Sequence, residues 1–172
     1  GGYDLGGGGA GTVGLAGEAG DVTVVGGGGD DTLAGGEGQD VGEFRGSMAG
    51  FTVAAAADGT LTVTDTNTGT ALGVDTVSEV ETLRFTDGDL AVTTASNGSV
   101  TLTGSSVTDV ITLVGTVGGI LEGGDGLDGL TGAGGNDVLD GGLGDDTLEG
   151  GFGGDVFVAL VGSDTIPSLI NF

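Results

Sequence analysis

The chain has 172 residues, of which 44 are glycine, and its 26 acidic residues outnumber 2 basic ones, for a formal charge of −24. Nucleic-acid binding needs a basic surface, so this charge argues against nucleic acid as a partner and excludes attraction to an anionic membrane. Cysteine and histidine are absent, which excludes disulfides and thiolate metal sites.

The composition also argues against a helical fold and against simple disorder. Glycine at this density costs roughly 1 kcal/mol per helical position. Hydrophobic residues make up 37% of the chain, enough to build a narrow core. No apolar run is long enough to span a membrane. With so few cations in the chain, metal ions are the candidates for neutralising the carboxylates.

Nine-residue units with a fixed phase begin near the N-terminus. The units "GGGGDDTLA" and "GGEGQDVGE" follow one another, with Asp31 and Asp40 at their sixth positions. Two weaker copies precede them: "GGGGAGTVG" has Gly11 at the sixth position and Val13 at the eighth, whereas "AGEAGDVTV" keeps Asp21. The first part of the chain is therefore predicted to be a repeat array.

An insertion interrupts this array after Asp40. It contains "FTVAAAADGTLTVTDT", in which Asp58 and Gly59 lie between two strand-like runs. An Asp-Gly pair in this context is a strong signal for a short hairpin turn. We expect an antiparallel hairpin at about residues 51–66.

The segment "GVDTVSEVETLRF" that follows the insertion aligns without gaps on "GSDTIPSLINF" at the end of the chain, which matches Asp75 with Asp164. Each segment follows a repeat block. We therefore divide the chain into a first β-roll block at residues 1–97, which carries the hairpin, and a second at 98–172. The chain opens without methionine and ends without a cap, so we expect a piece of a longer protein.

The second block holds the clearest repeat. Four units run without a gap: "GGDGLDGLT", "GAGGNDVLD", "GGLGDDTLE" and "GGFGGDVFV". Their sixth positions are Asp128, Asp137, Asp146 and Asp155, and their eighth positions are Leu130, Leu139, Leu148 and Phe157. Weaker copies flank them: "GSSVTDVIT" keeps Asp109, "ALVGSDTIP" keeps Asp164, and "VGTVGGILE" has Gly119 instead of aspartate. A flexible linker would not explain why aspartate recurs at the sixth position and an apolar residue at the eighth.

A unit of this kind can form one short strand and one tight turn, because glycine tolerates positive φ. Two units make a flattened coil of eighteen residues, and stacked coils bury the eighth-position side chains between two parallel sheets. The predicted fold is all-β: a parallel β-roll, or β-solenoid, of stacked coils with an inserted antiparallel hairpin.

Stacked turns bring the sixth-position aspartates together at intervals of eighteen residues, Asp128 over Asp146 and Asp137 over Asp155. Two carboxylates and several turn carbonyls then form a cage of oxygens suited to a hard cation. Calcium accepts 6–8 oxygens in flexible geometry, whereas magnesium demands a tighter octahedron. The lack of histidine and cysteine disfavours zinc and copper.

The repeat G-G-x-G-x-D-x-U-x resembles that of the RTX (repeats-in-toxin) family of secreted calcium-binding proteins. The resemblance covers about residues 6–44 and 104–166. It implies a parallel β-roll with several Ca²⁺ ions between the turns, type I secretion, and folding outside the cell, so we expect a secreted, extracellular or cell-surface protein.

The resemblance gives the ligand role to aspartates at the sixth position and to carbonyls of the turn glycines. The aspartates are Asp21, Asp31, Asp40, Asp109, Asp128, Asp137, Asp146, Asp155 and Asp164, with Asp75 added by its match to Asp164. The carbonyls are those of Gly124, Gly126, Gly142, Gly144, Gly151 and Gly153. For Asp21 and Asp109 a solvated turn is the competing interpretation.

The residue types argue against catalysis within the chain, because the usual nucleophile–base pairs need His, Cys or Lys. Glu79 and Glu81 could form a glycosidase pair, but a strand face or an outlying calcium ligand is the favoured interpretation.

We therefore predict a non-enzymatic, calcium-folded structural segment from a surface-layer, matrix, adhesin or filament-forming protein. Its open roll ends would favour end-to-end association into homo-oligomers. The alternative is the C-terminal calcium-binding module of a secreted protease, lipase or alginate epimerase, with catalysis outside this segment.

Overall fold

The computed structural model describes residues 4–6, 12, 14–56, 58–67, 72–95, 99–132 and 134–158, and these form short strands joined by turns. The strands are β1 (Asp4–Gly6), β2 (Gly14–Ala16), β3 (Thr23–Val25), β4 (Thr32–Ala34), β5 (Val41–Glu43), β6 (Phe51–Ala55), β7 (Leu61–Asp65), β8 (Val74–Ser78), β9 (Thr82–Arg84), β10 (Asp89–Thr94), β11 (Val100–Thr103), β12 (Val110–Val114), β13 (Ile120–Asp125), β14 (Gly129–Thr131), β15 (Val138–Leu143), β16 (Thr147–Glu149) and β17 (Val156–Val158). A 3-10 helix, η1 (Met48–Gly50), precedes β6.

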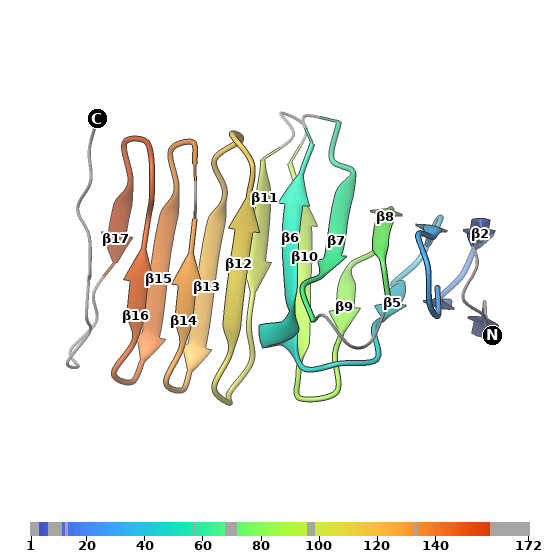
Figure 1. The fold of residues 1–172 in the computed structure, drawn as a ribbon, viewed down its shortest axis with the longest axis horizontal. Helices are drawn as coiled ribbons and strands as arrows, with labels where there is room; N and C mark the ends of the chain where they lie inside the picture. Colours follow the sequence, from blue (N-terminus) through green and yellow to red (C-terminus); the bar gives the residue numbers. More distant parts are fainter. Residues whose placement is uncertain are drawn as a thin grey trace.

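The strands form two sheets that run the length of the molecule (Figure 1). Among the described residues, one sheet has nine strands in the order β1-β3-β5-β9-β10-β11-β13-β15-β17. The other has eight, in the order β16-β14-β12-β6-β7-β8-β4-β2. Successive strands alternate between the sheets in the repeat regions, which is the signature of a solenoid. The predicted all-β roll with an antiparallel insertion is confirmed.

The C-terminal roll takes its core from the eighth position of each unit. Leu121 pairs with Leu139 and Leu139 with Phe157 in the nine-stranded sheet. In the facing sheet, Ile111, Leu130 and Leu148 are in register. The leucines of both rows are fully buried. Burying one such side chain stabilises the fold by about 1.5–3 kcal/mol, so each added coil extends a continuous core.

The N-terminal roll has the same plan, but its last coil is formed by residues that follow the insertion. β4 pairs in parallel with β8, which places Val77 beside Leu33. In the other sheet β5 pairs in parallel with β9, so that Gly42 lies beside Leu83. A Cβ on Gly42 would be in ordinary contact with the Phe44 ring, and this larger side chain supplies the apolar volume that glycine lacks.

Antiparallel strands join the two rolls. The predicted hairpin is β6–β7, closed by the turn at Asp58 and Gly59, and Gly59 has a φ of 88°. It is an integral part of the sheet: β7 also pairs with β8, and β6 pairs with β12 of the C-terminal roll. In the facing sheet β10 pairs antiparallel with both β9 and β11. Both sheets therefore pass from one repeat block to the other.

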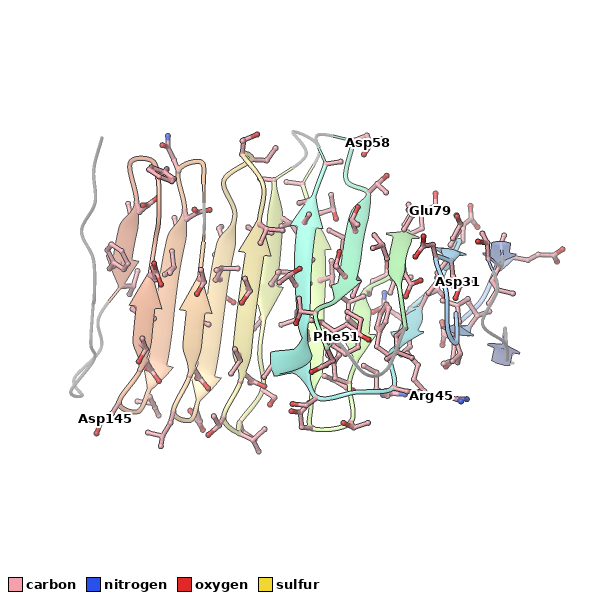
Figure 2. The ribbon with its side chains drawn as sticks, in the orientation of Figure 1. Asp31, Arg45, Phe51, Asp58, Glu79 and Asp145 are labelled. Atoms are coloured by element: carbon pink, nitrogen blue, oxygen red, sulfur yellow. The ribbon has the colours of Figure 1, made fainter. Side chains whose placement is uncertain are left out.

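The core of this central region is aromatic. The rings of Phe44 and Phe85 are stacked with centroids 5.6 Å apart, and Phe51 lies 5.1 Å from Phe85 and 5.8 Å from Phe44. Met48 of η1 is buried with them. Figure 2 shows Phe51 near the middle of the long axis of the molecule. The centre thus has a wider apolar core than the single leucine rows of the rolls.

Candidate metal centre

Most of the predicted aspartates are buried where a turn enters a strand. The buried carboxylates are those of Asp31, Asp40, Asp75, Asp109, Asp128, Asp137 and Asp146. Asp155 is half-buried and Asp164 lies outside the described residues. Buried carboxylates are rare unless they are hydrogen-bonded or bound to a cation, so their arrangement is the natural place to look for function.

Along one edge of the C-terminal roll, which we call the Asp146 edge, the carboxylates form a ladder. Oδ1 of Asp146 accepts a hydrogen bond from the amide of Asp128 at 2.8 Å, and Oδ1 of Asp128 accepts one from the amide of Asp109 at 2.8 Å. The last step spans nineteen residues, because the connection after β12 has one residue more than a repeat turn. Asp109 is therefore in the stack.

The opposite edge, the Asp137 edge, carries the second ladder. Oδ1 of Asp155 accepts a hydrogen bond from the amide of Asp137 at 3.0 Å, and Oδ1 of Asp137 accepts one from the amide of Gly119 at 2.8 Å. The predicted stacking of Asp137 with Asp155 is thus present. Gly119 ends the row of carboxylates without breaking the hydrogen-bond pattern.

The N-terminal roll continues both ladders. Asp75 accepts from the amide of Asp31 at 2.9 Å, although 44 residues separate the two along the chain. Asp40 accepts from the amide of Val22 at 2.8 Å. The carboxylate of Glu81 in turn accepts from the amide of Asp40 at 2.8 Å. Asp75 therefore holds a ladder position, and Glu81 occupies one that was not assigned as a site from the sequence.

The in-phase assignment of Asp21 is wrong by one residue. Thr23 pairs with Val41, so the residue stacked with Asp40 is Val22, and Asp21 lies one position earlier with an exposed side chain. The frame of the preceding unit also shifts, because Leu15 is in register with Leu33. Val13, the predicted core residue, and Gly11 lie outside the described residues.

The second oxygen of the ladder carboxylates is the unusual feature of these turns. Oδ2 of Asp40, Asp128 and Asp137 is fully buried and accepts no hydrogen bond within the described structure. An unsatisfied buried oxygen of this kind costs about 1–3 kcal/mol, and more when it is charged. A cation between the turns would remove that cost.

Glycine at the first position of each unit makes room for this oxygen. A Cβ on Gly123 would overlap Oδ2 of Asp128, and the same conflict recurs between Gly132 and Asp137. The full set with this conflict is Gly26, Gly35, Gly104, Gly123, Gly132, Gly141 and Gly150. None of them was predicted as a site residue, although their fixed spacing of five residues before the aspartate was a readable signal.

The predicted carbonyl donors lie in the same turns, and all of them except Gly126 are in the left-handed region. Gly124, Gly142 and Gly151 have φ values of 108°, 88° and 84°, while Gly144 and Gly153 have 144° and 138°. A Cβ on Gly142 would overlap the carbonyl oxygen of Gly124, and one on Gly144 that of Gly126. Turn carbonyls therefore point at the next coil, in the space that also holds the carboxylates.

A second set of hydrogen bonds, at the fifth position, runs in the opposite direction along the stack. Oδ1 of Asn136 accepts from the amide of Gly154 at 2.8 Å. Oδ1 of Asp30 accepts from the amide of Val74 at 2.9 Å, and Asp21 has the same role toward Gln39 at 3.0 Å. Sequence reasoning missed these contacts, and they give Asp21 a structural role outside the ladder.

Burial makes the metal-free ladder electrostatically unfavourable. It raises the pKa of Asp75 to about 6 and that of Asp137 to about 6, with neighbouring carboxylates adding to the rise. Burial also raises the pKa of Asp128, and the charges of Asp146, Asp109 and Asp125 reinforce the effect. Each shift reflects a carboxylate that water no longer solvates and that has other carboxylates nearby.

The donor set fits a hard cation that takes most of its ligands from the backbone. Within the described ranges no three acidic side chains converge on one point, so each ladder step offers two carboxylates and the turn carbonyls. Calcium accepts such mixed sets of carboxylate and carbonyl oxygens with flexible geometry.

In the part of the chain that the structure describes, no helix has the length and apolar character needed to cross a bilayer.

The nonapeptide repeat of this chain is also found in known proteins. A family model for four copies of the RTX calcium-binding nonapeptide repeat matches residues 15–41, 119–148 and 131–166. The crystal structure of the extracellular lipase LipA from Serratia marcescens aligns with a TM-score of 0.34 and 20% identity, over 85% of this chain and 29% of that chain. This chain thus spans less than a third of the lipase's length. No curated protein sequence matches it. With its phased glycines, its stacked aspartates and its two-sheet solenoid, the chain belongs to the RTX calcium-binding nonapeptide repeat family of the hemolysin type.

Proposed function

We propose that this segment is a calcium-dependent structural element of a secreted protein, which folds when Ca²⁺ enters the aspartate ladders. The observation that carries the proposal is the buried, unpartnered Oδ2 of Asp40, Asp128 and Asp137 among turn carbonyls. The residues that would hold the ions are the ladder carboxylates together with the predicted glycine carbonyls. A bound cation would neutralise these carboxylates and would be a partner for Oδ2 of Asp40, Asp128 and Asp137.

The ligand set that we propose follows the two ladders. It comprises Asp31, Asp40, Asp75, Asp109, Asp128, Asp137, Asp146 and Asp155, with Asp164 kept from the repeat pattern. The carbonyl donors are Gly124, Gly126, Gly142, Gly144, Gly151 and Gly153. Asp21 is left out because its side chain lies outside the stack.

The chain's own composition makes folding depend on the ion. A formal charge of −24 opposes compaction, and the glycines favour the unfolded chain entropically. Because the cages exist only in the folded state, the free energy of calcium binding contributes to the free energy of folding. Extracellular calcium modules bind at about 10⁻⁴–10⁻³ M, so the chain would stay unfolded in the cytosol and fold after export by type I secretion.

Circular dichroism and calorimetry test the proposal directly. Calcium should induce a β spectrum with release of binding heat, while magnesium at equal concentration and excess chelator should leave the chain largely unfolded. Asp128→Asn should raise the calcium concentration at the folding midpoint. Glu149→Gln is the charge-matched control, because the Glu149 side chain is exposed on β16 and outside the ladder, and it should leave the midpoint close to that of the wild type. A chain equally folded in chelator would contradict the proposal.

For the parent protein we propose a surface-layer, matrix or adhesin role, with association through the strand edges at the roll ends. Electron microscopy with and without calcium should show filaments or lattices only with the ion. The alternative remains the calcium-binding module of a secreted enzyme whose catalytic residues lie elsewhere.

A further inference from the structure

The Asp137 edge of the N-terminal roll ends on a turn that is not a repeat. Asp40 belongs to a glycine-rich unit, but the coil stacked on it comes from residues 74–84, beyond the insertion. Val41 pairs with Thr82, which places Glu81 where the next ladder aspartate would be. The carboxylate of Glu81 accepts the amide of Asp40 at 2.8 Å through Oε2, the role that Asp155 plays toward Asp137.

The turn that carries Glu81 is much shorter than a repeat turn. Three residues, 79–81, connect β8 and β9, and Glu79 has a φ of 54°. A non-glycine residue in the left-handed region is uncommon, and such conformations are often found at functional sites. This turn directs the carbonyl oxygen of Glu79 toward Gly35, where a Cβ would overlap it.

The same small space holds an oxygen of Asp40. A Cβ on Gly35 would meet both the Glu79 carbonyl and Oδ2 of Asp40. Asp40 is 0% exposed, and its Oδ2 accepts no hydrogen bond within the described structure. In the C-terminal roll the equivalent space beside Gly123 is bordered by Oδ2 of Asp128 and the carbonyl of Gly141. The non-repeat turn therefore reproduces the oxygen arrangement of a repeat turn with different residues.

We propose that Asp40, the carbonyl of Glu79 and the side chain of Glu81 form a divalent-cation site, specific for calcium, at the junction of the repeat and the non-repeat coil. The proposal rests on the proposed function, because it extends the same ion-binding chemistry to a turn outside the nonapeptide pattern. The side chain of glutamate is longer than that of aspartate. The flexible coordination of calcium accommodates this difference better than the strict octahedron of magnesium does.

Water can complete the coordination from the outer side of this junction. A cavity of about 430 Å³ borders it, lined by Glu79 and Glu81 together with Asp58 at the hairpin tip. Figure 2 shows Asp58 and Glu79 along the same margin of the molecule. The ion would thus connect residue 40 to residue 81 and stabilise the coil that follows the insertion against the N-terminal roll.

Amide NMR during a calcium titration of the full chain tests this site locally. In Glu81→Gln, the amides of Gly35 and Glu79 should need roughly tenfold or more calcium to reach their final shifts, while Leu130 and Leu148 in the C-terminal roll respond as in the wild type. Glutamine keeps an acceptor for the Asp40 amide, so the coil itself should form. Glu37→Gln is the matched control: Glu37 is exposed and lies in the turn that carries Gly35 and Asp40, so the variant removes the same charge beside the site without changing a proposed ligand.

The outcomes separate this inference from the proposed function. If no amide responds to calcium in the wild type, both are overturned. If the repeats respond but Glu81→Gln titrates like Glu37→Gln at Gly35, this site alone is overturned. If Glu81→Gln does not fold in saturating calcium, Asp40→Asn decides, since it keeps the acceptor for the Val22 amide. A weaker calcium response of Asp40→Asn that is confined to the junction supports the site, and a wild-type response of this variant at the junction overturns it.

Discussion

The carboxylate of Asp146 reaches to the previous coil and accepts the amide hydrogen of Asp128 at 2.8 Å. In Asp40, Asp128 and Asp137 one carboxylate oxygen accepts an amide hydrogen of the neighbouring coil, and the other accepts no hydrogen bond within the described structure. The ladder thus combines a structural hydrogen bond and an ion-binding oxygen in one side chain.

Replacing a first-position glycine should damage the ion sites more than an ordinary glycine substitution. Gly123→Ala places a Cβ against Oδ2 of Asp128 and the carbonyl of Gly141, so we expect a loss of about 1–3 kcal/mol and weaker calcium binding. Gly129→Ala is the control, because its Cβ would meet only Val110 at 4.0 Å. Chemical denaturation in saturating calcium measures both, and equal effects would contradict the prediction.

Acidification should stabilise the metal-free fold and oppose calcium binding. The pKa values of Asp75 and Asp137 are raised to about 6 in the folded chain, above the ordinary aspartate value near 4. The folded state therefore binds more protons than the unfolded state, and the free energy of unfolding falls as pH rises from about 4 to 6. Circular dichroism in chelator should show more structure at pH 4.5 than at pH 7.

Acidification should lower the calcium affinity, although it stabilises the metal-free fold. Protons compete with the ion for the same carboxylates, so the calcium midpoint should rise as pH falls from 7 to 5. A midpoint that is constant across this interval would show that Asp75 and Asp137 do not bind the ion.

The central region should keep residual structure when calcium is removed. Its core is the Phe44, Phe51 and Phe85 cluster, and its carboxylates have partners: Asp87 accepts the Met48 amide at 2.8 Å, and Asp89 pairs with Arg84. Hydrogen exchange in chelator should therefore protect amides of β6, β7 and β10 more than those of β14 and β16. Phe85→Ala should abolish this difference, since it costs about 3–5 kcal/mol in a packed core. Uniform exchange in the wild type would contradict the prediction.

The fifth-position hydrogen bonds should contribute to stability independently of the ions. Asn136→Ala removes the acceptor for the Gly154 amide and should cost about 0.5–1.5 kcal/mol in saturating calcium. Leu127→Ala is the control at the same repeat position, because Leu127 is 61% exposed and provides no acceptor. Its effect should stay within about 0.5 kcal/mol. If the calcium midpoint shifts as much as the stability, Asn136 belongs to the ion site instead.

The C-terminal roll was predictable because its four units keep phase without a gap, so that one frame places both the leucine rows and the ladder aspartates. The frame near Asp21 could not be read correctly, because glycines there are dense enough to support two alignments one residue apart. The pairing of β3 with β5 resolves it and puts Val22 in the stack.

The position of Glu81 in the ladder could not be predicted from the sequence for a different reason. Its position depends on β9 pairing with β5 across an insertion whose length carries no register information. The hairpin was predicted from Asp58 and Gly59, yet its place in the middle of a sheet follows from β6 pairing with β12, a long-range contact without a local signal.

The antiparallel strands at the centre also determine how the strand directions of the two rolls are related. Each sheet reverses strand direction twice between the rolls, from β8 through β7 to β6 and from β9 through β10 to β11. An even number of reversals restores the original sense, so both rolls wind the same way and their two ladders line up along common margins. One reversed strand in each sheet, β7 in one and β10 in the other, is therefore enough to join two repeat arrays without inverting one of them.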